Sequence, residues 1–167
     1  MTPRGQDGKP KPRIFRLPED EAVINRMGFP NLGLENFAKN LRGRAHRGGV
    51  VGVNLGANLD SEDRVADYVT CLEALRDDAH FFTVNISSPN TPGLRDMQSK
   101  KTLVELISRV VKVRGKAPLF LKIAPDIVDE EVADIIDVVT THKMDGVIIS
   151  NTTLARPDSL RSELAEE

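Results

Sequence analysis

The chain has 167 residues, 40% of them hydrophobic, and a formal net charge of −2 at pH 7. This length is typical of a single globular domain, and the slightly negative charge argues against nucleic acid as the main partner. The only cysteine, Cys71, excludes an intramolecular disulfide and a multi-cysteine metal site, and its place in a helical pattern predicts a buried, inert thiol. No apolar stretch is long enough to span a bilayer, and no targeting segment follows Met1.

We expect residues 1–20 to form an N-terminal arm and one short strand. Residues 1–12 are rich in Gly, Pro and basic side chains, which predicts an extended and poorly anchored segment. Residues 13–17 alternate polar and apolar side chains, as a half-buried strand does, and residues 25–31 are typical of a loop. The main unit is expected over residues 21–163, with a short divergent tail at residues 164–167.

From residue 50 onward, apolar strands alternate with amphipathic helices. The predicted strands are residues 50–55, 81–86, 119–123 and 146–150, and the predicted helices are residues 34–44, 61–78, 100–113 and 129–139, with Ser61 and Asp129 as caps of the second and the last. The inner faces of the last three helices are expected to carry Val65, Tyr68, Val69, Leu72 and Leu75, then Leu103, Leu106, Ile107 and Val110, then Val132, Ile135, Ile136 and Val139. This alternation indicates βαβ units and a parallel sheet.

The fold class that follows is α/β. No glycine-rich dinucleotide fingerprint follows any of the strands, so a Rossmann fold has lost its main support. A section of a (β/α)8 TIM barrel fits better, and the chain supplies about four of the eight βα units of such a barrel.

Each predicted strand ends in a polar group: Asn54, Asn85, Lys122 and the run Ser150-Asn151-Thr152. In a barrel, these groups meet at the mouth formed by the carboxyl ends of the strands. Carboxamides both donate and accept hydrogen bonds, so the set Asn25, Asn54, Asn85, Asn90 and Asn151 can match a pyrimidine-like ring. The alternative is that these asparagines only stabilise turns.

Two single residues allow a functional and a structural interpretation. Lys122 lies in an apolar strand and needs an anionic or electron-rich partner if it is buried, unless its side chain reaches solvent at the strand end. Ser88 follows a strand and precedes Pro89, where the residues alone favour a turn residue slightly over a catalytic serine. A serine hydrolase is disfavoured because no Gly-x-Ser-x-Gly motif surrounds Ser88 and no histidine lies at a strand end. The three histidines also show no metal-ligand spacing.

Five segments together resemble one enzyme family. They are Asn25–Phe29 (NRMGF), Gly52–Gly56 (GVNLG), Asn85–Leu94 (NISSPNTPGL), Leu121–Asp126 (LKIAPD) and Ser150–Leu154 (SNTTL). In order and approximate spacing they resemble the quinone-dependent (class 2) dihydroorotate dehydrogenases, and the similarity extends from about residue 2 to residue 163. The resemblance implies an FMN oxidoreductase that oxidises (S)-dihydroorotate to orotate in pyrimidine biosynthesis and passes the electrons to ubiquinone.

The resemblance also implies residue roles. Ser88 would be the catalytic base that takes a proton from ring carbon 5. FMN would be contacted by Asn54, Asn85, Lys122 and Ser150. The substrate would be held by Asn25, Arg26, Met27, Gly28, Phe29, Asn85, Asn90, Asn151 and Thr152. Thr91 and Phe29 would shape the path of the proton, and residues 91–95 would form a lid that excludes water.

The family's other segments should lie outside this chain. These are the first barrel strands, the glycine-rich segments that bind the FMN phosphate, and the N-terminal helices that contact the membrane and the quinone. We therefore expect a fragment or truncated isoform that alone binds FMN weakly or not at all and does not turn over, with membrane association only through the missing segments. The parent protein would lie at the mitochondrial inner membrane in a eukaryote and at the inner membrane in a bacterium.

Two alternatives stay open. One is a different FMN barrel reductase acting on pyrimidines, although such enzymes carry cysteine where Ser88 stands. The other is a non-catalytic product that acts by binding a partner.

Overall fold

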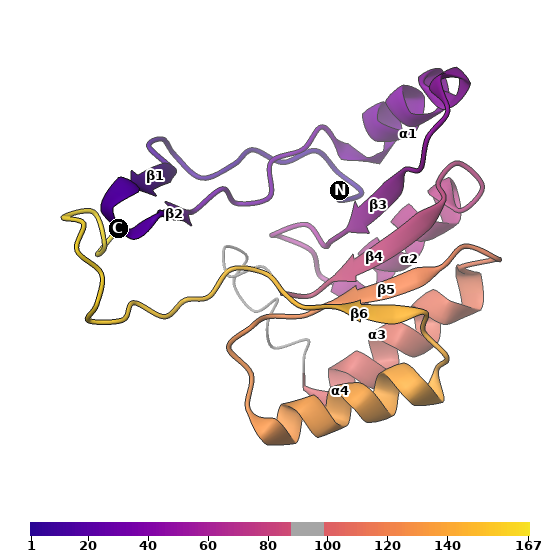
Figure 1. Ribbon diagram of the computed structural model, residues 1–167. Coiled ribbons are helices and arrows are strands. Elements are labelled where there is room, and N and C mark those ends of the chain that lie inside the picture. Colours follow the sequence, from indigo (N-terminus) through magenta and orange to yellow (C-terminus); the bar gives the residue numbers. More distant parts are fainter. Residues whose placement is uncertain (88–98) are drawn as a thin grey trace.

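The computed structural model describes residues 1–87 and 99–167, and it shows two sheets and four α-helices (Figure 1). The strands are β1 (Ile14–Leu17), β2 (Ala22–Asn25), β3 (Gly52–Leu55), β4 (Phe81–Asn85), β5 (Leu119–Lys122) and β6 (Gly146–Ile148). The helices are α1 (Gly33–Gly43), α2 (Arg64–Leu75), α3 (Lys100–Val113) and α4 (Asp129–Thr141), and short 3-10 turns cover Pro18–Asp20 and Ala45–Arg47. Each predicted strand is confirmed to within two residues at its ends.

The main sheet is parallel, with strand order β3-β4-β5-β6, and its helices cover one face (Figure 1). This arrangement is α/β and forms part of a TIM barrel, as the alternation of strands and helices predicts. Side chains along a strand alternate between the two faces. The helix-facing set is therefore apolar and almost fully buried: Val53, Leu55, Phe82, Val84, Ile86, Leu119, Leu121 and Ile123.

Helix α3 confirms its predicted inner face completely, because Leu103, Leu106, Ile107 and Val110 are all fully buried. Helix α4 does not. Its buried residues are Ile135 and Val138, whereas Ile136 is 60% exposed and Val132 is 37% exposed. The predicted inner face is thus confirmed for Ile135 and for the partly buried Val139, but wrong for Val132 and Ile136. The reason is that α4 lies at the end of the helix layer and packs against α3 on one side only (Figure 1). Part of its wide apolar stripe consequently faces outward.

Two predicted helix caps are displaced. Asp63, not Ser61, caps α2, since its carboxylate accepts a hydrogen bond from the Ala66 N–H at 2.8 Å. Aspartate and serine are about equally good caps, so composition alone does not choose between them. Asp129 lies in the first turn of α4, and the Glu131 carboxylate accepts from the Val128 N–H at 3.0 Å.

The expectation of a poorly anchored N-terminal arm was wrong. Met1 and Thr2 are buried, and the Met1 carbonyl accepts a hydrogen bond from the Gly56 N–H at 2.9 Å. The side chain of the buried Asn58 accepts from the Arg4 N–H at 3.0 Å and donates to the Arg4 carbonyl at 3.0 Å. A polar, glycine-rich composition predicts few apolar contacts, but here backbone groups of the arm are satisfied by the segment that follows β3.

Strand β2 was not predicted. It pairs with β1 in an antiparallel hairpin, in the register Ile14↔Asn25 to Leu17↔Ala22, so the expected boundary after residue 20 falls inside this hairpin. Phe15, Leu17 and Ile24 form a second small core with Leu160 and Ala165 of the C-terminal segment. The hairpin and that segment both lie beyond the carboxyl ends of the main strands (Figure 1). None of the helices described by the structure is long and apolar enough to cross a membrane.

Candidate functional site

The face of the main sheet opposite α2, α3 and α4, called here the inner face, carries the polar strand ends. Alternation along the strands places Asn54, Thr83, Asn85 and Lys122 on it. Asn54 is paired with Thr83 in the sheet register, and Asn85 is paired with Lys122. Three of the four predicted FMN residues thus lie on one face, and two of them are immediate neighbours.

Two aromatic rings close the amino-terminal end of the inner face. Phe81 and Phe120 meet edge to face, with ring centroids 5.7 Å apart and planes at 89°. Glycine leaves the room they need, since a Cβ atom at Gly52 would lie 2.1 Å from the Phe81 ring and one at Gly146 would lie 3.1 Å from the Phe120 ring. Sequence reasoning missed this aromatic floor. Its signal is a glycine at the start of β3 and of β6, each paired with a phenylalanine of a neighbouring strand, Phe81 in β4 and Phe120 in β5.

Asn85 and Asn151 are joined by a buried serine that sequence reasoning also missed. Asn85 Oδ1 accepts hydrogen bonds from the Ser87 N–H at 3.1 Å and the Ser87 hydroxyl at 2.9 Å. Asn151 Nδ2 donates to Ser87 Oγ at 3.2 Å, and Asn151 Oδ1 accepts from the Thr152 N–H at 2.8 Å. We call Asn85, Ser87 and Asn151 the carboxamide network. It connects the end of β4 with the segment after β6.

Helix α2 supports this network from behind. The Tyr68 hydroxyl donates to the Asn85 carbonyl at 2.7 Å, and burial raises the pKa of this phenol well above its usual value. The neighbouring Cys71 is buried too, and burial raises the pKa of its thiol to about 12. The predicted burial of this thiol is confirmed, and its low reactivity stays a prediction.

Asp126 lies in the segment that follows β5. Its hydrogen bonds hold the segment that follows Thr152. Its carboxylate accepts hydrogen bonds from the Thr153 hydroxyl and from the Leu154 N–H, the latter at 3.0 Å. Thr153 Oγ1 in turn accepts from the Ala155 N–H at 2.9 Å. Ser150, the fourth predicted FMN residue, is half-buried, and its hydroxyl donates to the Asn151 carbonyl at 3.0 Å.

The predicted substrate segment Asn25–Phe29 begins at the end of β2 and reaches the end of β3. Gly28 has φ +76°, and a Cβ atom there would lie 2.8 Å from the Lys9 backbone nitrogen, so both backbone conformation and space require glycine. A Cβ atom at Gly56 would lie 2.8 Å from the Phe29 ring. Phe29 therefore packs directly over the chain that leaves β3, beside the mouth of the partial barrel.

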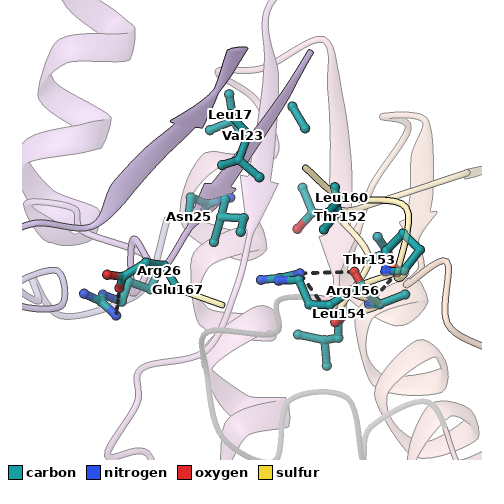
Figure 2. Close-up of a pocket in the computed structure, with 14 residues that line it drawn as sticks. Leu17, Val23, Asn25, Arg26, Thr152, Thr153, Leu154, Arg156, Leu160 and Glu167 are labelled. Carbon is teal, nitrogen blue, oxygen red and sulfur yellow. Dashed lines mark hydrogen bonds and ion pairs between the residues drawn. The ribbon is translucent and has the colours of Figure 1, made fainter. Parts of the chain in front are cut away.

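A cavity of about 540 Å³ lies between the β1–β2 hairpin and the segment after β6, and Figure 2 shows the residues that line it. Asn25 and Arg26 line it from the hairpin side, and Thr152 lines it from the other side. Arg26 contacts Glu167 at 3.5 Å, and its guanidinium lies 4.8 Å from the centre of the Phe15 ring. The structure thus brings these three predicted substrate residues to one cavity, whereas Asn85 and Asn151 do not line it.

Some predicted site residues cannot be placed. Ser88, Asn90, Thr91 and the predicted lid at residues 91–95 lie outside the described residues. Within the described part of the chain, no three His, Cys, Asp or Glu side chains are grouped so that they could hold a metal ion.

Comparison with known proteins places this geometry in one family. A family model described as dihydroorotate dehydrogenase matches residues 1–166. The chain is 55% identical over 171 residues to the dihydroorotate dehydrogenase (quinone) of Bradyrhizobium sp. strain BTAi1, covering 98% of this chain and 47% of the relative. It is 53% identical over 175 residues to the protein of that name from Brucella ovis, covering 100% of this chain and 48% of the relative.

Solved structures agree with the sequence comparisons. The dihydroorotate dehydrogenase of Eimeria tenella in complex with ferulenol superposes with a TM-score of 0.93 at 39% identity, covering 100% of this chain and 52% of that chain. The ligand-free form from the same organism gives a TM-score of 0.91 at 38% identity and covers 54% of that chain. The chain spans about half the length of the relatives it matches. Its sequence and its fold together show that it belongs to the dihydroorotate dehydrogenase family.

Proposed function

We propose that this chain supplies the inner face that binds FMN and dihydroorotate in a quinone-dependent dihydroorotate dehydrogenase, which oxidises (S)-dihydroorotate to orotate in pyrimidine biosynthesis. The observation that carries the proposal is the carboxamide network beside Lys122, with Asn85 as the residue common to both. Amides fixed in direction next to a cation suit a flat ring that has carbonyl groups and gains negative charge.

The residues present fit FMN. Lys122 is half-buried, and among the described residues it has no carboxylate partner, so electron-rich atoms of a bound ring would satisfy its ammonium group. The rings of Phe81 and Phe120 provide apolar contacts at the amino-terminal end of the same face. The flavin ring would be held by Asn54, Asn85, Lys122 and Ser150. When bound, FMN supplies an acceptor for the hydride of ring carbon 6 and passes the two electrons on to ubiquinone.

The chain's own residues would orient the substrate and move its proton. Asn85, Asn90, Asn151 and Thr152 would hold the ring, together with the segment Asn25–Phe29. Ser88 would accept the proton of ring carbon 5, and loss of that proton and of the hydride forms the C5–C6 double bond of orotate. Thr91 and Phe29 would shape the exit path of the proton, and residues 91–95 would cover the site.

Because ubiquinone is lipid-soluble, the second half of the reaction would take place at a membrane surface. We propose the bacterial inner membrane for a bacterial source and the mitochondrial inner membrane for a eukaryotic one. In either case the contact with the membrane and with the quinone would be made by other segments of the family fold.

The test is a chimaera in which residues 1–163 replace the matching segment of the Bradyrhizobium relative. We expect the purified chimaera to retain FMN, to lose the oxidised flavin colour when dihydroorotate is added without oxygen, and to reduce a soluble ubiquinone analogue. Ser88→Ala should abolish the dihydroorotate-dependent colour change while FMN stays bound.

Other outcomes would favour the alternatives. A folded, FMN-loaded chimaera that leaves dihydroorotate untouched, beside an active Bradyrhizobium parent, would contradict the proposal. Reduction of uracil in place of dihydroorotate oxidation would indicate another pyrimidine reductase. The isolated chain, assayed in parallel, is expected to bind FMN weakly and to show no turnover.

A further inference from the structure

We propose that the buried hydroxyl of Ser87 is a positioning group that fixes the directions of the Asn85 and Asn151 carboxamides, so that both present N–H groups to the ligand. This inference rests on the proposed function, because it assigns a role within that same site. In this role Ser87 touches neither the flavin ring nor the substrate ring. It acts through the two amides.

The hydrogen-bond inventory of Ser87 allows one arrangement. Its hydroxyl has a single proton, which is donated to Asn85 Oδ1 at 2.9 Å, and its oxygen accepts from Asn151 Nδ2 at 3.2 Å. Ser87 is 0% exposed, so water does not compete for these bonds. A reversed Asn85 amide would turn its NH₂ group toward the backbone N–H of Ser87, which at present donates to Asn85 Oδ1 at 3.1 Å. Two donors of Ser87, its hydroxyl and its backbone N–H, thus hold Asn85 Oδ1 on the side of Ser87.

The amide groups that remain are donors. Asn85 uses its oxygen on Ser87, and none of the described residues accepts a bond from its Nδ2. Asn151 uses its oxygen on Thr152 and one Nδ2 proton on Ser87, which leaves the second proton for a ligand. This end of the site therefore selects a ligand with acceptor atoms, such as the ring carbonyls and the carboxylate of an orotate-like molecule. A ligand with N–H groups at the same place would face the N–H groups of Asn85 and Asn151 and could not form hydrogen bonds with them.

The first test needs only the chain itself and no turnover. Solvent exchange of the Asn side-chain amide protons is measured by NMR in the chain as it stands, in Ser87→Ala and in Ser87→Thr. In Ser87→Ala, we expect at least roughly tenfold faster exchange for Asn151, whose only bond to residue 87 is lost. Asn85 should change less, because the backbone N–H of residue 87 still donates to it, and Ser87→Thr should restore slow exchange.

A matched control removes a serine hydroxyl elsewhere. Ser108 Oγ lies 2.9 Å from His142 Nε2 between α3 and α4, away from the site, so Ser108→Ala should leave both asparagines unchanged. Unchanged Asn151 exchange in a folded Ser87→Ala chain would overturn the proposal. If Ser87→Ala does not fold, the exchange rate in the unsubstituted chain still tests the proposal. Asn151 side-chain protons that exchange as fast as those of a free amide would contradict the hydrogen bond from Asn151 to Ser87.

The second test uses the chimaera described above. Ser87→Ala should lower kcat/KM for dihydroorotate by roughly 10- to 100-fold at full FMN occupancy, with most of the loss in kcat, because the ring is bound but badly aimed. Ser87→Thr should recover most of the activity, and Ser108→Ala should match the unsubstituted chimaera. Normal kcat/KM in Ser87→Ala would overturn the positioning role. Failure of the unsubstituted chimaera to turn over would count against the proposed function only, since the exchange experiment judges Ser87 separately.

Discussion

Lys122 is a charged residue in an apolar strand, and the strand register explains its position at the candidate site. A lysine within an apolar strand has two physical outcomes, a solvent-exposed ammonium or a buried one with a partner. The register places it next to Asn85, at the end of β5 and above the Phe120 side chain on the same face. Its half-buried position beside an amide favours a role in binding an electron-rich ring.

This role can be tested by removing the charge in the chimaera. Lys122→Met should weaken FMN binding by roughly 10- to 100-fold, because a charge-assisted hydrogen bond is lost. Lys122→Arg keeps the charge but not the compact ammonium, so we expect an intermediate affinity. FMN affinity is measured by the flavin fluorescence change on titration.

The control replaces an exposed lysine just before the same strand. Lys116→Met removes an equal charge from the loop that precedes β5 and should leave FMN affinity unchanged. Equal losses in the two variants would mean that net charge, rather than the position of Lys122, governs binding.

At the scale of elements, Asn58 shows how a loop residue organises the first part of the fold. Only 2% of it is exposed, and its Nδ2 donates to the Arg4 carbonyl and to Gln6 Oε1, both at 3.0 Å. Its own N–H donates to the Asp67 carboxylate at 2.8 Å. The side chain of Asn58 thus ties the N-terminal arm to the segment after β3, and its backbone N–H ties the same segment to helix α2.

We expect Asn58→Ala to lower the free energy of unfolding by about 2 to 3 kcal/mol, because the Arg4 N–H loses its acceptor and the buried Asn58 side chain loses its bonds to the arm. The buried Cys71 thiol provides the measurement, since it should react with a thiol reagent only when the structure opens. Labelling during a urea titration then reports the unfolding midpoint. Asn40→Ala, at an exposed site in α1, should shift that midpoint little, and equal midpoints for the two variants would contradict the role of Asn58.

At the scale of the whole molecule, predictability follows the range of the interactions involved. Strands β3 to β6 and helix α3 could be predicted because their period and burial are written into consecutive residues. The anchoring of the arm could not, because Met1 and Gly56 meet only when the fold closes. The same holds for Asp20, whose carboxylate accepts from the Arg161 and Ser162 N–H groups, both at 3.0 Å, from the far end of the chain.

The candidate site divides in the same way. Asn54, Asn85 and Lys122 could be predicted as a group because parallel strands align their carboxyl ends. Ser87 was missed because a small buried hydroxyl leaves no trace in a hydrophobic pattern, and its importance depends on Asn151, which is 64 residues away. Helical spacing also does not indicate how much of α4 its neighbours cover, so Ile136 was predicted on the inner face although it is exposed.

When the 167 residues are prepared as a separate chain, we expect the Met1 amine to make its stability depend on pH. Burial lowers the pKa of the Met1 amine from 8.0 to about 6, while this amine donates to the Asn54 carbonyl at 3.0 Å. Above pH 8 the amine is neutral in both the folded and the unfolded chain. As pH falls from 8 to 6 the unfolded chain binds a proton that the folded chain does not, so folding weakens, by roughly 2 kcal/mol over this window.

Urea unfolding of the chain at pH 6, 7 and 8 measures this dependence, and the same series on chain acetylated at its amino terminus removes the titrating group. The acetylated chain should have a flatter profile between pH 6 and 8, whatever its absolute stability. The carboxyl pKa values of Asp20 and Asp63 are lowered, chiefly by hydrogen bonds from the Arg161 and Ala66 N–H groups respectively, so their contribution is lost only as pH falls below about 4. Parallel profiles for the free and acetylated chains would show that the Met1 amine is not the group responsible.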